Sequence, residues 1–159
     1  MRKEILMMMV VTSFLLLLTA CGSKDKDPDK HGHVYKVVID PGHGGKDKGA
    51  TGADGHYEKE FTLNLGKKVE GLLKKEPNIK VYMTRNKDRF ISQKSRYRPE
   101  YANKKDADLF ISIHENVFDD PDVSGTQSFY YHMDSRAFAE TMQKHVAKAT
   151  GFHDRGVKK

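Results

Sequence analysis

The sequence contains one cysteine, Cys21, among its 159 residues, so an intrachain disulfide is excluded. Its glycine-rich stretch near residues 42–55 lacks the glycine spacing of a dinucleotide site and the lysine–hydroxyl ending of a P-loop. The formal net charge is +6, but the basic residues form no stripe with interleaved aromatics, which argues against nucleic-acid binding. A modest positive charge instead suits an anionic polymer or membrane surface.

The N-terminal residues 1–20 have the pattern of a secretory signal. Arg2 and Lys3 precede an apolar stretch at residues 5–18, which is short for a membrane span. Leu-Thr-Ala then leads directly into Cys21, which resembles the lipobox of bacterial lipoproteins. This resemblance implies a lipidated Cys21 and an exported lipoprotein anchored in the membrane of the bacterial cell envelope. The alternative is ordinary signal cleavage with a leftover thiol.

The rest of the chain divides into a tether and one domain. Residues 21–33 are polar and charged without apolar periodicity, which predicts a flexible tether. Residues 34–159 have the length of a single domain. Apolar patterns in this domain predict strands at 34–40, 79–85, 108–114 and 126–131, and helices at about 58–75, 92–105 and 135–149. This alternation predicts an α/β layered domain with a largely parallel or mixed central sheet flanked by helices.

Several details of these elements can also be predicted. The helix at 58–75 should bury the face formed by Phe61, Leu65, Val69, Leu72 and Leu73. The continuous apolar run at 108–114 predicts a strand buried on both faces. Pro99 should disturb the helix at 92–105, and Gly151 should cap the last helix, on which Phe138, Met142 and Val146 share a face.

Two histidines and one glutamate lie next to the ends of predicted elements. His43 follows the first strand, Glu58 lies at a turn-to-helix junction, and His114 ends the third strand. Functional groups of open α/β sheets gather at the carboxyl ends of strands. Two imidazoles and a carboxylate, with one coordination position open, form the ligand set of a catalytic zinc. Taken singly, His43 has a plainer interpretation as a loop hydrogen-bonding residue and Glu58 as a helix-start residue.

Four segments, in order, resemble the zinc-dependent N-acetylmuramoyl-L-alanine amidases of the amidase-3 family: IDPGHGGKDKGATG, YEKEFTLNL, VYMTRNKD and RYRPEYANKKDADLFISIHEN. The resemblance extends from about Val34 to Lys159. The two histidines and the glutamate of these motifs bind zinc in that family, which implies that His43, Glu58 and His114 are metal ligands. The family hydrolyses the amide between N-acetylmuramic acid and L-alanine, which implies peptidoglycan stem peptide and glycan as partners.

The resemblance also implies a missing part. Family members continue beyond a segment like RGVKK with a strand whose glutamate acts as general base and proton donor. This chain stops at Lys159, so the comparison implies a C-terminally incomplete domain that is weakly active or inactive. Glu115 is a candidate replacement for that base. Neighbouring strand residues point to opposite faces, however, so we expect Glu115 to face away from the metal held by His114.

Three hypotheses of function follow. The first is a lipid-anchored, monomeric cell-wall amidase with Zn²⁺ as cofactor. The second is a non-catalytic lipoprotein that keeps the zinc and binds peptidoglycan. The third is a secreted zinc peptidase of a different fold, against which the absence of an HExxH motif argues.

Other polar residues have two possible roles each. Asp40 could orient His43 as a hydrogen-bond acceptor or cap the loop. His56 lies close enough to Glu58 in sequence to compete for the metal, and Asn116 could position substrate or only turn the chain. We expect the remaining candidates to have structural or surface roles, or to lie in the tether: Arg85, Asp88, Arg96, Asn103, His132, His145, His153, His31 and His33.

Overall fold

The computed structural model describes residues 32–116 and 123–159. Along them the elements are β1 (Tyr35–Pro41), α2 (Glu58–Leu73), β2 (Ile79–Met83), the 3-10 helix η2 (Gln93–Ser95), α3 (Tyr97–Lys104), β3 (Leu109–Ile113), β4 (Thr126–Phe129), the 3-10 helix η3 (Met133–Ser135), α4 (Arg136–Thr150) and β5 (Asp154–Lys158). The predicted α/β alternation is confirmed. β5 was not predicted, because Val157 is its only apolar side chain. The signal segment, Cys21 and His31 lie outside the described residues.

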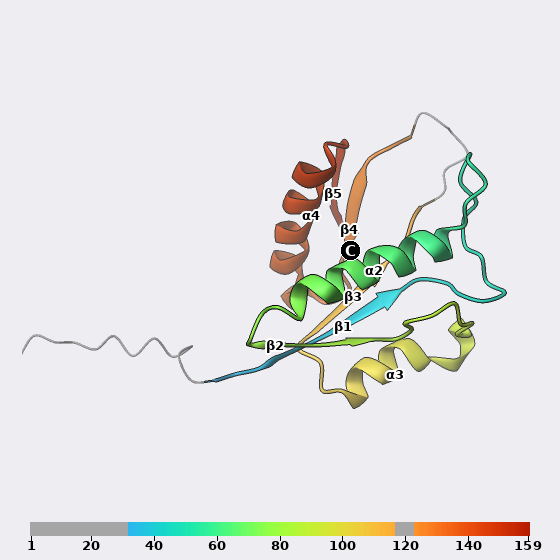
Figure 1. Ribbon diagram of the computed structural model, residues 1–159. Coiled ribbons are helices and arrows are strands. Elements are labelled where there is room, and N and C mark those ends of the chain that lie inside the picture. The colour runs from blue at the N-terminus through green and yellow to red at the C-terminus, as the bar shows by residue number, and fades with distance from the viewer. Residues whose placement is uncertain (1–31, 117–122) are drawn as a thin grey trace, which may run out of the picture.

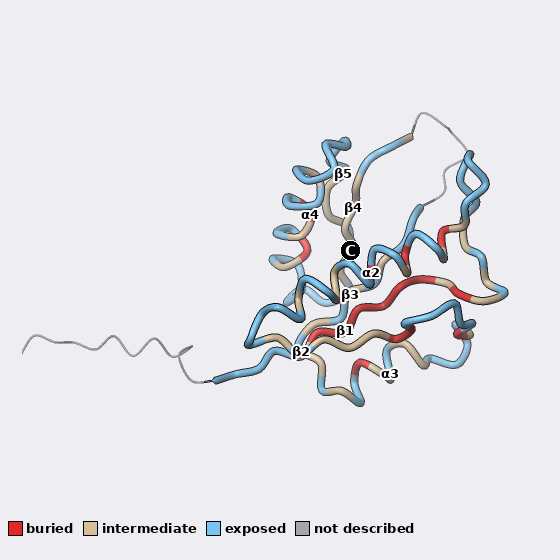
Figure 2. The backbone as a smooth tube through the Cα atoms, in the orientation of Figure 1, coloured by how far each residue is buried: buried red, intermediate tan, exposed pale blue. Residues whose placement is uncertain are grey.

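β1 is the middle strand of a parallel three-stranded sheet with the order β2-β1-β3. Val38 and Ile39 of β1 are fully buried, and Figure 2 shows buried residues running along this strand. Figure 1 shows α2 and α3 on opposite sides of the three strands. The core therefore lies along β1, and the strand leads directly into the glycine-rich loop that carries His43.

β4 and β5 form a second parallel sheet, and α4 packs against both strands. Among the described residues, β3 is paired with β1 alone, so it is an edge strand. The prediction that both faces of the third strand are buried is wrong, because Phe110 is 42% exposed and Ser112 is exposed as well. The apolar run correctly predicted a strand, but it did not predict that one face of the strand is exposed.

The predicted buried face of the first helix is also wrong. Phe61 and Leu72 of α2 are exposed, whereas Thr62 and Gly66 are buried. A Cβ atom on Gly66 would lie 2.9 Å from Cγ of Pro41. The absence of a side chain at this position lets α2 approach β1 closely, and this close packing fixes the position of Glu58 at the start of the helix.

The last helix, α4, begins and ends within one residue of its predicted bounds, whereas α3 begins at Tyr97, later than the predicted start at 92. Arg96 has a left-handed backbone (φ 53) that separates η2 from α3. The prediction that Pro99 disturbs this helix is wrong. Pro99 is the third residue of α3, where a backbone N–H would have no partner within the helix, so proline is tolerated there. Gly151 caps α4 with φ 69, as predicted, and donates its N–H to the Ala147 carbonyl at 3.0 Å. Phe138 and Met142 of α4 are half-buried, but Val146 is 36% exposed.

None of the helices within residues 32–116 and 123–159 has both the length and the apolar character needed to cross a membrane.

Candidate metal centre

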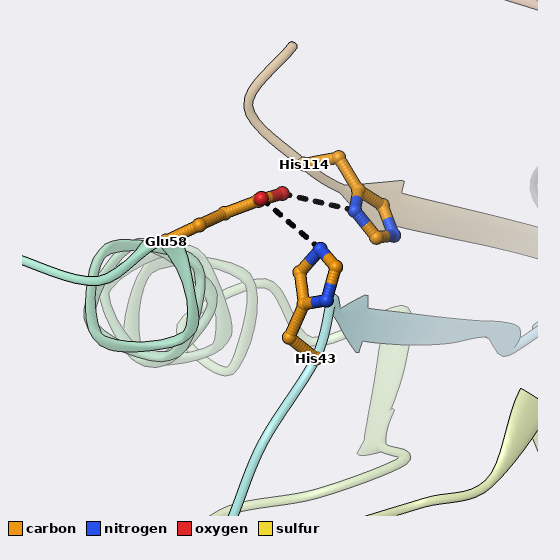
Figure 3. Close-up of side chains that lie close together, drawn as sticks. All are labelled: His43, Glu58 and His114. Carbon is orange, nitrogen blue, oxygen red and sulfur yellow. Dashed lines mark hydrogen bonds and ion pairs between the residues drawn. The ribbon is translucent and has the colours of Figure 1, made fainter. Parts of the chain in front are cut away.

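The three predicted ligand residues meet at the carboxyl edge of the larger sheet. His43 lies two residues after β1, His114 directly follows β3, and Glu58 is the first residue of α2. β1 and β3 are in parallel register, with Pro41 opposite Ile113, so both strands end at the same edge. Figure 3 shows the Glu58 carboxylate reaching from the helix toward the two imidazoles. The prediction that these residues gather at the carboxyl ends of the strands is confirmed.

Each Glu58 oxygen faces one histidine. Oε2 lies 3.0 Å from Nε2 of His43, and Oε1 lies 3.0 Å from Nδ1 of His114. The donor atoms of the three residues lie within 4.8 Å of one another, and within the described part of the chain this is the only cluster of its kind. The Glu58 side chain is 3% exposed, whereas that of His114 is 45% exposed. The centre therefore has a buried carboxylate and one side open to solvent.

Two glycines leave room for these side chains. A Cβ atom on Gly42 would lie 2.4 Å from the His114 ring, and one on Gly49 would lie 2.6 Å from the Glu58 carboxylate and 2.7 Å from the His43 ring. Gly49 also has a φ of +69, which L side chains rarely adopt. The glycine-rich loop thus lets its backbone pass against the ligand side chains without displacing them.

The surroundings of Glu58 keep its carboxylate ionised. Burial alone would raise the pKa of Glu58, but backbone N–H groups of Ala50 and Glu115 donate to it at 2.9 and 2.7 Å, and His43 lies beside it. These favourable contacts outweigh burial, so the pKa lies below its ordinary value. An ionised carboxylate is the form that binds a metal.

Asp47 orients His43. Its Oδ1 atom lies 2.9 Å from Nδ1 of His43, so a proton on Nδ1 leaves Nε2 as the free ligand atom. Burial raises the pKa of Asp47, but the hydrogen bond and charge of His43 outweigh it and lower the pKa below the ordinary value. The suggestion that Asp40 plays this role is wrong. Asp47 was not predicted from the sequence, because its contact with His43 depends on how the glycine-rich loop folds.

The other candidate residues lie apart from the cluster. Asp40 accepts hydrogen bonds from Thr84, Arg98 and Ser112 behind the metal centre. His56 is 79% exposed and pairs with Glu60 rather than joining Glu58. Arg85 is buried and donates to loop carbonyls, and Asp88 pairs with Lys59, as their predicted structural roles require. The structure places Nε2 of His33 3.4 Å from Oδ1 of Asp108.

The residues fit a zinc ion. Zinc accepts imidazole nitrogen and carboxylate oxygen, and catalytic sites use three protein ligands with the fourth position open. The cluster supplies that donor set, and Asp47 provides a hydrogen-bonded partner for His43. Fold and site together define an α/β domain with a His–Glu–His group, of the kind that can hold one metal ion, at the carboxyl edge of a parallel sheet.

Comparison with known proteins identifies the family. A family model described as N-acetylmuramoyl-L-alanine amidase, Amidase_3, matches residues 37–159. The chain therefore belongs to the Amidase_3 family. It is 39% identical over 129 residues to N-acetylmuramoyl-L-alanine amidase AmiC of Escherichia coli O6:H1, covering 80% of this chain and 30% of that protein. It is 37% identical over 126 residues to N-acetylmuramoyl-L-alanine amidase LytC of Bacillus subtilis, covering 77% of this chain and 25% of LytC.

Solved structures agree with this assignment. The catalytic domain of CwlV, an N-acetylmuramoyl-L-alanine amidase from Bacillus (Paenibacillus) polymyxa var. colistinus, superposes with a TM-score of 0.74 at 42% identity. That match covers 78% of this chain and 69% of the CwlV chain. An N-acetylmuramoyl-L-alanine amidase from Clostridium difficile 630 gives the same TM-score at 33% identity, covering 80% of this chain and 70% of that one. The layered α/β architecture is that of the family.

Proposed function

We propose that this chain is a zinc-dependent amidase domain that cleaves the amide between N-acetylmuramic acid and L-alanine in peptidoglycan. The single observation that carries the proposal is the His43–Glu58–His114 cluster, which has the ligand set of a three-ligand zinc site and lies in a member of an amidase family. The chain spans less than half the length of the curated relatives that it matches. We therefore propose the activity of those relatives for this chain.

The residues of the chain would act by holding the zinc ion and by orienting the side chains that bind it. Zinc at such a site supplies hydroxide at neutral pH and polarises a carbonyl, which are the two requirements of amide hydrolysis. Glu58 contributes negative charge from a buried position, and Asp47 holds the His43 ring with Nε2 toward the site. His114 lies on the exposed side of the cluster, so a peptidoglycan strand would approach past its ring.

One observation favours a second candidate. Glu58 is the only carboxylate of the cluster among the described residues, and it serves as a ligand, which leaves no general base assigned there. Glu115 donates its backbone N–H to Glu58, and its side chain is not among the clustered donors. The second candidate is a lipoprotein that binds zinc and peptidoglycan without cleaving it.

Wall digestion distinguishes the two candidates. The zinc-loaded chain is incubated with purified peptidoglycan, and the products are analysed by mass spectrometry. The amidase proposal predicts free stem peptides that begin with L-alanine. Zinc binding and co-sedimentation with peptidoglycan, without released peptides, would establish the second candidate instead. Glu58→Ala should abolish zinc binding, whereas Glu60→Ala is the matched control, an exposed acidic residue in the same first turn of α2.

We also propose that the protein is an exported monomer anchored through lipid on Cys21. The support is sequence alone, because the apolar stretch and Cys21 lie outside the described residues. Two or more acyl chains would give a stable anchor, where one is marginal. Growth with labelled palmitate should mark the wild-type chain but not Cys21→Ala, and the variant should leave the membrane fraction. Light scattering of the detergent-solubilised chain tests whether the protein is a monomer.

A further inference from the structure

The guanidinium of Arg98 contacts three residues of the segment that ends in a metal ligand. Arg98 is the second residue of α3, and its side chain is 14% exposed. Its Nη1 atom donates to the Asp40 carboxylate and, at 2.8 Å, to the Pro41 carbonyl. Its Nη2 atom donates to the His43 carbonyl at 2.9 Å. One side chain from a helix outside the ligand loop therefore holds the backbone on both sides of Gly42.

His43 needs such support because its backbone is left-handed. Its φ is +60, a conformation that is unfavourable for a residue with a Cβ atom. This backbone conformation accompanies the placement of Nε2 beside Glu58 and of Nδ1 beside Asp47. The hydrogen bond from Arg98 to the His43 carbonyl fixes the peptide plane directly after the ligand residue, and so opposes relaxation of the loop.

The Asp40 carboxylate extends this link to the other ligand strand. Asp40 is 2% exposed and also accepts from Ser112 Oγ at 2.9 Å. Asp40 and Ser112 are register partners on β1 and β3, and Ser112 lies two residues before His114. Burying a carboxylate is costly unless an opposite charge and hydrogen bonds compensate it, and Arg98 supplies both. The Arg98–Asp40 pair thus lies where the strands carrying His43 and His114 are joined.

We propose that Arg98 is a positioning residue of the metal centre, which sets the affinity for zinc through the His43 backbone and the Asp40–Ser112 link. Arg98 donates to no ligand side chain, so its effect is transmitted through the main chain. The inference rests on the proposed zinc function. A purely structural role predicts lower stability with unchanged zinc affinity, and this difference makes the two roles separable.

Arg98→Lys tests the proposal, because lysine keeps the charge but cannot bridge two carbonyls and a carboxylate with one planar group. Arg96→Lys is the matched control, since Arg96 is exposed and lies two residues away. Zinc dissociation constants are measured on the full chain by competition with a chromophoric chelator, alongside the absorption spectrum of the Co²⁺-loaded chain and circular dichroism. We expect Arg98→Lys to weaken zinc binding at least about tenfold and to alter the Co²⁺ spectrum, with Arg96→Lys within about twofold of wild type.

The outcomes are distinguishable. A folded Arg98→Lys chain with a zinc dissociation constant within about twofold of wild type overturns the positioning role. If Arg98→Lys does not fold, Ser112→Ala decides, because it removes only the hydrogen bonds from the Ser112 hydroxyl to Asp40 and leaves the backbone pairing of β1 and β3 intact. Weaker zinc binding by Ser112→Ala supports the proposal, and unchanged binding overturns it. A wild-type chain that binds no zinc overturns the proposed function itself. Equal zinc binding by wild type and variant is a separate result, which overturns only the positioning role of Arg98.

Discussion

Nδ1 of His43 lies 2.9 Å from Oδ1 of Asp47, four residues further along the same loop. The loop contains Gly44, Gly45 and Gly49, all with positive φ, which lets the chain fold back so that the two side chains meet. The same Asp47 oxygen accepts the Gly49 N–H at 3.3 Å. A single carboxylate therefore ties the orientation of a ligand ring to the turn that passes beside Glu58.

Removing this contact should weaken metal binding. Asp47→Ala leaves Nδ1 of His43 without its acceptor, so the ring loses its preferred tautomer and orientation. Loss of such a partner usually costs about 10–100-fold in metal affinity, and we expect a zinc dissociation constant raised within that range. Asp54→Ala is the control, because Asp54 is an exposed aspartate of the same loop. Equal affinities for Asp47→Ala and wild type, measured by chelator competition, would contradict the orienting role.

The space left by Gly49 gives a second test. Gly49→Ala would place a Cβ atom 2.6 Å from Glu58 Oε2 and 2.7 Å from the His43 ring, so the ligands must move and zinc affinity should fall at least about tenfold. Gly55→Ala shares the backbone strain, with φ +83, but meets no atom within 4 Å. We therefore expect both variants to lose stability and only Gly49→Ala to lose affinity. If titration calorimetry showed a similar loss of zinc affinity in both variants, backbone strain rather than the contact with the ligand side chains would be the cause.

The clustering of His43, Glu58 and His114 could be predicted from the sequence because each of them lies next to a strong local signal. A β-branched run ends before His43, an apolar run ends at His114, and an acidic first turn marks Glu58. Asp47 and Arg98 carried no such signal. Asp47 depends on the fold of a glycine-rich loop, and Arg98 reaches Asp40 across a sequence separation of 58 residues. Hydrophobic periodicity contains no information about either contact.

The buried face of α2 shows a different limit of sequence patterns. Phe61, Leu65 and Leu72 recur at helical spacing, yet Thr62 and Gly66 are the buried residues, and Gly66 makes the close contact with the sheet. The Thr62 hydroxyl donates to the Gly42 carbonyl at 2.9 Å and receives a hydrogen bond from buried Arg85. A count of apolar residues predicts that large apolar side chains form the buried face of the helix. Close packing over a polar network requires small side chains on that face instead.

Two glycines of α2 should respond oppositely to alanine. Gly71 is exposed, and a Cβ atom added there would meet no atom within 4 Å, so Gly71→Ala should raise the free energy of unfolding by about 0.5–1 kcal/mol through the better helix propensity of alanine. Gly66→Ala would meet Pro41 at 2.9 Å and Met83 at 3.3 Å, and overpacking should lower stability by about 1 kcal/mol or more. Urea denaturation of both variants checks this. Stabilisation by Gly66→Ala would show that α2 packs less closely on β1.

Asp88 should make stability depend on acid. Hydrogen bonds from Lys59 Nζ at 2.8 Å and from the Gly45 N–H at 2.6 Å lower the pKa of Asp88 below its ordinary value of 3.8. The unfolded chain therefore binds the proton more readily, so the stability that Asp88 contributes is fully present above pH 3.8 and is lost as pH falls through the lower pKa of the folded state. Because the Asp88 side chain is 54% exposed, the contribution at neutral pH should not exceed about 1 kcal/mol.

We expect Asp88→Asn to be less stable than wild type in urea denaturation at about pH 6, and the difference to shrink as pH falls toward about 3. A difference that stays constant over this range would mean that the carboxylate charge of Asp88 does not contribute to holding Lys59 against the loop.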